Sequence, residues 1–308
     1  MVILLGSEGY IGKEFQNQLE ELGVETYCLF AYNYNYYELD TLKQVLYEKK
    51  PEFLINCDAY AGDGNIDNCE DNQDKTTRVN VSLVQTISKA CLMMGVPWGH
   101  VSSGSIYDGE PPAANGFIEE DMPNFSFTLG NGNHYSMSKA KAEEVIAHTG
   151  GDYYIWRLKL PFDEYDCNTN LLSKLMHSNM NLDANNSISH KGDFVKYCLT
   201  LWQTKADFGI YNVVNSGPIS TKEITDKINK ILTIDKNFVF FENQDQAFKL
   251  GALRAQRSSA VLDNSKLRKA IHPKRVRNAS KAIEASLKQW REKEQDKDVN
   301  GIPKSFWD

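Results

Sequence analysis

Short strand-like runs alternate with longer amphipathic stretches along the first half of the chain. The runs rich in apolar and β-branched side chains span residues 2–5, 25–30, 53–56, 96–101 and 153–160. Apolar side chains at helical spacing fill the intervals at residues 13–22, 40–49, 71–94 and 135–146. Regular alternation of strand and helix is typical of a parallel sheet covered by helices on both faces. The pattern therefore predicts an α/β fold with a Rossmann-type, doubly wound parallel sheet.

The pattern loosens after residue 162. A polar stretch follows, with a helical core at 171–176, and helices are then expected at 194–202, 220–232 and 279–293. Further strands are expected at 209–214 and 238–241. We predict a dinucleotide-binding domain at 1–162, to which 192–218 returns, and a smaller substrate-binding subdomain at 163–191 and 219–293. Residues 294–308 form a charged tail in this prediction.

A glycine-rich turn lies between the first strand and the first helix. It has the spacing G-x-x-G-x-x-G and consists of Gly6, Ser7, Glu8, Gly9, Tyr10, Ile11 and Gly12. Such a turn lets the backbone approach a pyrophosphate at the N-terminus of a helix, so it predicts NAD(H) or NADP(H) binding. The segment after the second strand, 31–37, holds neither the carboxylate that selects NAD nor the arginine that selects NADP. The choice of coenzyme stays open at this point.

Polar side chains follow the later strands at the sheet edge where open α/β folds bind ligands. The third strand is followed by Asn56, Asp58 and Ala59, and the fifth ends at Pro161; we predict that these residues contact the coenzyme. Three hydroxyls follow the fourth strand. Ser102 is predicted to contact the coenzyme, and Ser103 and Ser105 the substrate. Asn80, in the helix expected at 71–94, is predicted to lie in the coenzyme site and to orient a catalytic lysine through a water molecule.

Tyr135 and Lys139 are the predicted centre of the chemistry. They are four residues apart in a predicted helix, so their side chains project to the same side. A phenol titrates near ~10 and a lysine near ~10.4 when isolated. A nearby ammonium stabilises phenolate, so the pair is expected to lower the tyrosine pKa and to exchange a proton with an alcohol oxygen. We predict that both residues also contact the coenzyme.

Charge and cysteine content exclude several classes of protein. The net charge of −7 argues against a nucleic-acid partner, which would require a basic face. No run approaches the ~20 apolar residues of a membrane span, and the start lacks a basic leader. The six cysteines are scattered and have no histidine partners at ligand spacing, so we expect reduced thiols and no metal site. These features predict a cytoplasmic protein.

In combination, the glycine turn, the ends of the third and fourth strands and Tyr135-x-x-x-Lys139 resemble the extended short-chain dehydrogenase/reductases. The chain is most similar to the dTDP-4-dehydrorhamnose reductase group and to the reductase/epimerases that complete UDP-L-rhamnose synthesis. The similar segments are 65–70, 116–125, 135–144, 209–212 and 256–267. The resemblance implies NADPH- or NADH-dependent reduction of a 4-keto-6-deoxy nucleotide sugar, and dimers are usual among these relatives.

The same resemblance implies individual roles. Tyr135 would protonate the oxygen at C4, Lys139 would lower its pKa and hold the nicotinamide ribose, and Ser103 would bind the carbonyl oxygen. Arg257 matches an arginine near the diphosphate, where a guanidinium suits phosphate. Lys174 lies where the bifunctional enzymes place a lysine near the sugar.

Departures from the family pattern leave alternatives open. Ser105 stands where the plant-like enzymes have a cysteine tied to 3,5-epimerisation, and a hydroxyl is a poorer acid–base group than a thiol. Simple reduction is therefore favoured over a bifunctional epimerase/reductase. Residues 62–64 replace a stretch with an arginine, and Lys159 stands where an arginine is usual. A nucleotide-sugar 4-epimerase and a non-catalytic, reductase-like regulatory subunit are the remaining alternatives.

Overall fold

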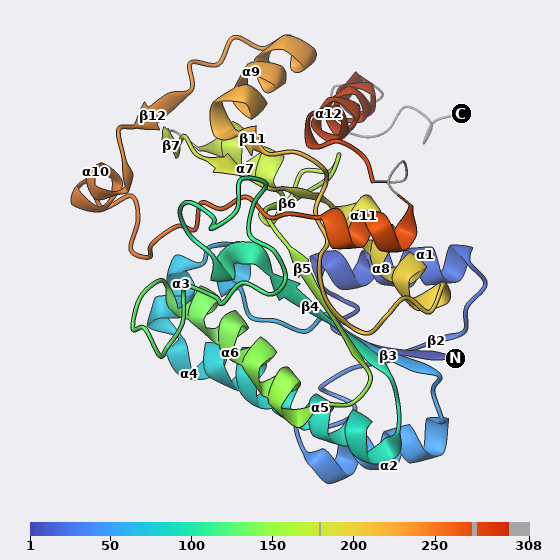
Figure 1. Ribbon diagram of the computed structural model, residues 1–308. Helices are drawn as coiled ribbons and strands as arrows, with labels where there is room; N and C mark the ends of the chain where they lie inside the picture. The colour runs from blue at the N-terminus through green and yellow to red at the C-terminus, as the bar shows by residue number, and fades with distance from the viewer. Residues whose placement is uncertain (179, 273–275, 296–308) are drawn as a thin grey trace.

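A six-stranded parallel sheet forms the centre of the protein (Figure 1). The computed structural model describes residues 1–178, 180–272 and 276–295. The strands follow the order β10-β5-β4-β3-β1-β2, and every neighbouring pair is parallel. Their bounds are β1 Val2–Leu5, β2 Thr26–Leu29, β3 Phe53–Asn56, β4 Trp98–Ser103, β5 Tyr153–Leu158 and β10 Gly209–Asn212. This confirms the predicted α/β, doubly wound fold.

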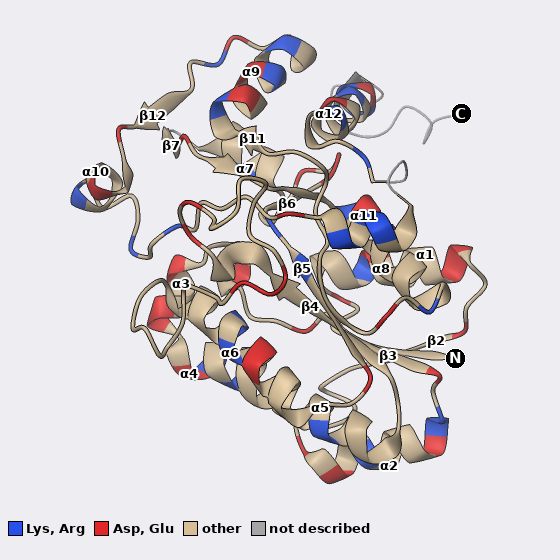
Figure 2. Cartoon of the chain, viewed as in Figure 1, with Lys and Arg blue, Asp and Glu red and all other residues tan. Residues whose placement is uncertain are grey.

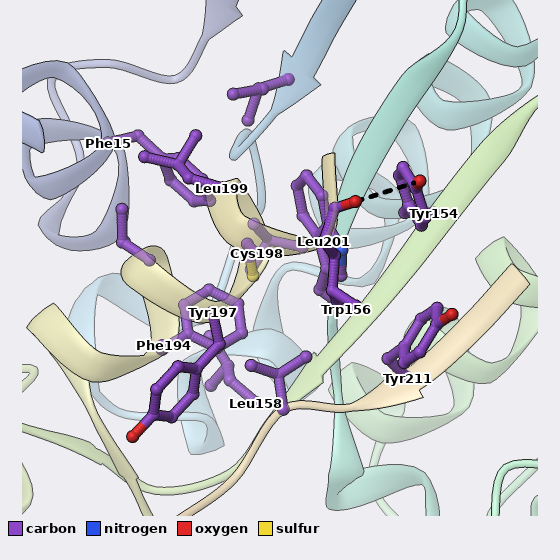
Figure 3. Close-up of a cluster of buried hydrophobic side chains, with 14 of the residues drawn as sticks. Phe15, Tyr154, Trp156, Leu158, Phe194, Tyr197, Cys198, Leu199, Leu201 and Tyr211 are labelled. Atoms are coloured by element: carbon purple, nitrogen blue, oxygen red, sulfur yellow. Dashed lines mark hydrogen bonds between the residues drawn. The ribbon is translucent and has the colours of Figure 1, made fainter. Parts of the chain in front are cut away.

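Helices cover both faces of this sheet. One face packs against α1 (Tyr10–Glu21), α8 (Lys191–Gln203) and α11 (Ser265–Ile271), through a cluster that includes Phe15, Trp156 and Phe194 (Figure 3). The other face packs against α2 (Leu39–Lys49), α5 (Leu83–Met94) and α6 (His134–Thr149). Charged side chains gather on these outer helices, while the central strands are mainly tan in Figure 2. The layering follows from the apolar runs of the sequence.

The helix predicted at 71–94 is confirmed from Gln73 onward, but it contains a π-helical turn and a separate short helix precedes it. The structure divides the region into α3 (Asp67–Asp71), α4 (Gln73–Thr77), a π-helical turn (Arg78–Ser82) and α5. Asn72 breaks the first helix with φ −125° and ψ 48°, outside the helical region. A π turn adds a residue to one helical turn and changes the direction of the side chains after it. Asn80, which is fully buried, lies within this turn.

A second group of elements packs beyond the carboxyl ends of the strands. Its buried apolar residues come mainly from α7 (Leu171–His177), α9 (Thr221–Leu232) and α12 (Ala279–Gln295). Three two-stranded pairs accompany them: β6 (Pro161–Phe162) with β9 (Ser189–His190), β8 (Asn185–Asn186) with β11 (Ile219–Ser220), and β7 (Met180–Leu182) with β12 (Val239–Phe241). This separate core lies where the sequence predicts the smaller subdomain, whose boundaries stay a prediction.

Several local predictions can be compared with these elements. The start of α9 is confirmed, with Ser220 and Glu223 forming a reciprocal capping box. Two short helices, α10 (Gln244–Lys249) and α11, were not predicted. Most of the predicted charged tail, 296–308, lies outside the described residues. None of the described helices is long and apolar enough to span a membrane.

A buried ion pair joins α6 to the sheet. Arg157 on β5 and Glu143 on α6 have side chains that are 2% and 5% exposed, with Nη2 2.7 Å from Oε2. Arg157 Nε donates to both carboxylate oxygens at 3.1 Å, and Ser102 on β4 donates to Oε1 at 2.5 Å. Arg157 Nη1 donates to the Tyr107 hydroxyl at 3.0 Å. Because each charge has several partners, the network can persist without water.

We predict that Glu143→Gln lowers the free energy of unfolding by about 3–5 kcal/mol, since it leaves the guanidinium of Arg157 buried without its countercharge. Urea unfolding followed by circular dichroism measures this. Glu144→Gln is the matched control, because Glu144 pairs with Lys141 on the exposed side of α6, where both side chains are at least 43% exposed. That variant should change stability by less than about 1 kcal/mol. Equal effects of the two substitutions would contradict the proposed anchor.

Candidate functional site

The glycine turn is packed too tightly for any side chain at two of its positions. Gly6 has φ +72°, and a Cβ there would lie 2.7 Å from the backbone nitrogen of Asp58. A Cβ on Gly12 would lie 2.0 Å from the Gly6 carbonyl oxygen, so the first turn of α1 rests directly on the end of β1. The sequence predicted this close approach of helix and strand. It places the N-terminus of α1 at the carboxyl edge of the sheet.

The unpaired polar groups of this turn fit a dinucleotide. Gly9 is the N-cap of α1. Because glycine has no side chain, it cannot accept a hydrogen bond from the first amides of the helix. The hydroxyl of Ser7 is buried and has no hydrogen-bond partner in the described part of the chain. The hydroxyl of Tyr10 is also buried, but the Asp163 carboxylate lies close to it. Donors of this kind at a helix N-terminus suit a diphosphate, so the residues present fit the group.

Tyr135 and Ser103 meet at the end of β4. Tyr135 lies in the first turn of α6, where Asn133 caps the helix by accepting from the Ser136 amide at 2.7 Å. The hydroxyl of Ser103 is a hydrogen-bond partner of the Tyr135 phenol and also accepts from the Ser105 amide at 3.1 Å. Burial raises the pKa of Tyr135 to about 12, and the hydrogen bond from Ser103 opposes this rise. The phenol therefore keeps its proton at neutral pH.

Lys139 lies behind Tyr135 and is 1% exposed. Its Nζ donates to the Val101 carbonyl at 2.9 Å and lies 3.1 Å from His100 Nε2. Burial lowers the pKa of Lys139 to about 8, although the Glu143 carboxylate raises it. The expected lowering of the tyrosine pKa by this lysine is not met, because burial dominates at Tyr135 and its pKa rises.

The hydrogen bonds around His100 determine which of its two ring nitrogens carries the proton. Asn56 Oδ1 accepts from the Asp58 amide at 3.0 Å, so its Nδ2 is the atom that donates to His100 Nδ1, at 3.1 Å. A neutral imidazole that accepts at Nδ1 carries its proton on Nε2. That proton points at Lys139 Nζ, which can accept it only as a neutral amine. Burial and the nearby lysine also hold the pKa of His100 well below its usual range.

Two predicted coenzyme residues have other partners in the structure. Asn80 Oδ1 accepts from the Tyr60 amide at 2.8 Å, and Nδ2 donates to the Tyr60 carbonyl and to Ser138 Oγ at 3.0 and 2.9 Å. It therefore fixes the chain after β3 to α6 rather than contacting Lys139. Ser102 uses its hydroxyl on Glu143, so this side chain supports the helix. Ala59 is exposed at the end of β3, and Pro161 begins β6.

The predicted substrate residues come from three separate segments. Arg257 forms a two-pronged contact with Asp67, with Nη1 and Nη2 donating to its carboxylate at 2.8 and 2.9 Å. Asp67 also accepts from the Ala255 amide at 2.8 Å, which fixes this segment against α3. Burial and then the charge of Arg257 lower the pKa of Lys174, so these two cations lie near each other. Lys174 and Arg257 thus lie near each other, and their contacts with a substrate stay a prediction.

Other functional candidates were not singled out from the sequence. Lys159 is fully buried and donates to Ser258 Oγ at 2.7 Å; burial lowers its pKa to about 7. His100 and Asp67 gave no signal, because their partners are distant in the chain. Glu143 could have been found, since it follows Lys139 by four residues on the same side of a helix. No cluster suited to a metal ion lies within the described residues.

This combination of a glycine turn, a Rossmann-type sheet and a serine, tyrosine and lysine at one edge defines a protein of the short-chain dehydrogenase/reductase class. The family model "RmlD substrate binding domain" matches residues 1–291. The chain belongs to this family.

Curated relatives share about a quarter of the residues. A bifunctional dTDP-4-dehydrorhamnose 3,5-epimerase/dTDP-4-dehydrorhamnose reductase of Arabidopsis thaliana is 27% identical over 276 residues, covering 86% of each chain. A trifunctional UDP-glucose 4,6-dehydratase/UDP-4-keto-6-deoxy-D-glucose 3,5-epimerase/UDP-4-keto-L-rhamnose-reductase of the same plant is 27% identical over 276 residues. That match covers 87% of this chain but spans 39% of the plant protein.

Solved structures share the fold over almost the whole chain. The L780 UDP-rhamnose synthase from Acanthamoeba polyphaga mimivirus has a TM-score of 0.83 at 20% identity, covering 94% of this chain and 98% of that one. A dTDP-4-dehydrorhamnose reductase from Bacillus anthracis in complex with NADP has a TM-score of 0.75 at 20% identity, covering 92% and 96%. At these identities the likeness establishes the fold alone.

We predict that Lys139 titrates near pH 8 in the ligand-free protein, because burial disfavours its charged form. Carbon and nitrogen NMR of the labelled lysine side chains measures this, with Lys139→Met identifying the signal. Glu143→Gln should move the midpoint lower still, since the carboxylate it removes raises this pKa. The exposed lysines serve as internal controls. A midpoint for Lys139 at the ordinary lysine value, about 10.4, would contradict the lowering of its pKa by burial.

Proposed function

We propose that this protein reduces the keto group of a 4-keto-6-deoxy nucleotide sugar with NADPH or NADH. The observation that carries the proposal is the contact between the Tyr135 phenol and the Ser103 hydroxyl, beside the glycine turn at the carboxyl edge of the sheet. The plant relative that matches over 86% of both chains is named as a dTDP-4-dehydrorhamnose reductase, which supports the substrate class.

The coenzyme would be held by groups whose hydrogen bonds are unused within the protein. The first amides of α1 and the Ser7 hydroxyl would bind the diphosphate, and Gly6 and Gly12 leave room for the backbone to approach it. Asn56 and Asp58 lie at the end of the adjoining strand. When bound, the reduced nicotinamide supplies the hydride for carbonyl reduction.

The protein's own residues supply the proton and stabilise the developing charge. Tyr135 is protonated at neutral pH and is the donor to the sugar oxygen. Ser103 donates a second hydrogen bond to that oxygen, which stabilises negative charge as it forms. Lys139 in its ammonium form would stabilise the phenolate left on Tyr135. With a pKa of about 8, Lys139 is already largely protonated at neutral pH, and the negative charge of a bound coenzyme would raise the protonated fraction further.

The substrate diphosphate would bind near Arg257 and Lys174. A guanidinium gives two parallel hydrogen bonds to phosphate, and the outer edge of Arg257 faces away from its contact with Asp67. Ser105 lies two residues after Ser103 and is partly exposed, so its hydroxyl is available to the sugar. Lys174 lies on α7 and Arg257 in the segment 219–293, so both belong to the predicted substrate-binding subdomain.

We propose reduction without 3,5-epimerisation. Epimerisation removes a proton from a carbon beside the carbonyl, and this step needs a base that ionises near neutral pH. Ser105 offers a hydroxyl where a thiol occurs in the similar enzymes. A nucleotide-sugar 4-epimerase and a non-catalytic subunit remain as alternatives, which one assay separates.

Location and assembly belong to the proposal as well. All six cysteines are free thiols in the structure, which supports a reducing compartment such as the cytoplasm. A homodimer is expected only from the resemblance to the family. Light scattering after gel filtration determines the mass in solution.

Removal of the proposed proton donor, the Tyr135 phenol, is the main test of the proposed function. Tyr135→Phe should reduce turnover by at least about a hundredfold, because it removes the transferable proton. Affinity for the coenzyme should stay within a few-fold. Tyr47→Phe is the matched control, since Tyr47 lies on α2 and is 64% exposed, and it should retain full activity. Turnover is followed by loss of absorbance of NADPH or NADH with 4-keto-6-deoxy sugars bearing UDP or dTDP.

Each outcome of this assay has a distinct meaning. Oxidation of coenzyme coupled to a new 4-hydroxy sugar supports the reductase. A changed sugar without net consumption of coenzyme identifies an epimerase. Coenzyme binding without turnover of any sugar identifies the non-catalytic subunit. Retention of most activity by Tyr135→Phe would contradict the assigned donor.

A further inference from the structure

A carboxylate from β3 occupies the corner where dinucleotide-binding folds usually read the adenosine ribose. Asp58 lies two residues beyond β3, and its backbone nitrogen lies against Gly6, the first glycine of the turn. Tyr36, from the loop after β2, donates to Asp58 Oδ2 at 2.5 Å. The side chain of Asp58 is thereby held across the end of β1, between the ends of β2 and β3. In the common arrangement this carboxylate is supplied by β2 itself.

One oxygen of this carboxylate is free. Asp58 Oδ2 accepts from Tyr36, whereas Oδ1 has no hydrogen-bond partner among the residues that the structure describes. Burial raises the pKa of Asp58, the Tyr36 hydrogen bond lowers it, and the nearby Glu8 carboxylate adds a further rise. Glu8 itself is exposed on the glycine turn. The corner therefore holds two acidic groups and one unused acceptor.

The nearest positive charge in this corner is more loosely held. The Arg78 guanidinium lies over the Tyr37 ring at 4.9 Å, and Tyr37 stacks on Tyr36 with ring centres 5.5 Å apart. Arg78 and Asp58 act on Tyr37 in opposite directions, the first lowering and the second raising its pKa. Arg78 is exposed and reaches the corner on a flexible side chain. Asp58 is fixed by a hydroxyl and by the glycine turn, so its position is better defined.

The two coenzymes differ at this point by one group. NADH carries a ribose 2′-hydroxyl, which donates to a carboxylate oxygen, whereas NADPH carries a 2′-phosphate with about two negative charges. Like charges at close range in a partly buried site cost several kcal/mol. The repulsion of a 2′-phosphate by the carboxylates of Asp58 and Glu8 therefore exceeds its attraction to the exposed, mobile guanidinium of Arg78.

We propose that Asp58 makes the protein select NADH over NADPH, by accepting a hydrogen bond from the adenosine ribose 2′-hydroxyl and, with Glu8, by repelling a 2′-phosphate. This inference rests on the proposed function, because it assumes that the glycine turn binds a nicotinamide dinucleotide. The segment after β2 leaves the choice between NADH and NADPH open, and this inference assigns that choice to Asp58, which follows β3.

Binding measured without any sugar substrate tests the proposal. Isothermal titration calorimetry of the full chain should give a dissociation constant for NADH at least about tenfold below that for NADPH, about 1.4 kcal/mol. Asp58→Asn keeps the shape and an acceptor oxygen but removes the charge. It should reduce the ratio of the two dissociation constants by roughly tenfold or more, mainly by strengthening the binding of NADPH.

Three further variants test separately the general effect of surface charge, the position of the Asp58 carboxylate and the contribution of Arg78. Asp40→Asn removes the same charge from a 94% exposed carboxylate on α2 and should leave the ratio unchanged. Tyr36→Phe removes the hydroxyl that holds Asp58, so it should weaken NADH without strengthening NADPH. Arg78→Gln should weaken NADPH further and leave NADH nearly unchanged.

The failures of the two proposals are distinguishable. Binding of both coenzymes with NADPH equal or tighter in the wild-type protein would overturn the selection by Asp58 and leave the reductase proposal intact. An unchanged ratio in Asp58→Asn would overturn it as well. Absence of binding of either coenzyme would overturn the proposed function together with this inference. The wild-type ratio requires no variant, so poor folding of a variant does not prevent the test.

Discussion

The ion pair between Glu143 and Arg157 is the contact on which the site depends. It joins α6, which carries Tyr135 and Lys139, to β5, and it fixes β4 through the Ser102 hydroxyl. In a medium that excludes water, such a pair persists only when both charges are fully hydrogen-bonded, as they are here. Ser103 follows Ser102 directly, so one buried carboxylate sets the distance between the phenol and its hydroxyl partner. The geometry of the chemistry is thus a consequence of core packing.

Burial also sets the resting protonation of the site. The same exclusion of water that strengthens the ion pair raises the pKa of Tyr135 to about 12 and lowers that of Lys139 to about 8. Both shifts favour the neutral forms, and the hydrogen bonds of His100 are consistent with a neutral amine. In the stability balance, Lys139 opposes folding at pH values below 8. This cost shrinks as the pH rises toward ~10.5, because there the unfolded chain retains a proton that the folded chain has released.

Local patterns in the sequence predicted what local geometry determines. The strands and the glycine turn follow from periods of a few residues, and both are present. The parts that the sequence did not reveal are contacts between distant segments. Asp67 and Arg257 are 190 positions apart, and Tyr36 and Asp58 are 22 apart in the loops after two different strands. The π turn before α5 is also a product of packing, since Asn80 turns inward to bind the chain after β3.

An acidic protein that binds anionic ligands must concentrate its cations where they are needed. With a net charge of −7, the average surface repels a nucleoside diphosphate. Lys174 and Arg257 lie near each other, Lys159 contacts Ser258, the residue after Arg257, and burial lowers the pKa of both lysines. A bound diphosphate would stabilise their charged forms, so ligand binding and protonation would favour each other. Asp67 pairs with Arg257, so this guanidinium has a countercharge before any ligand binds.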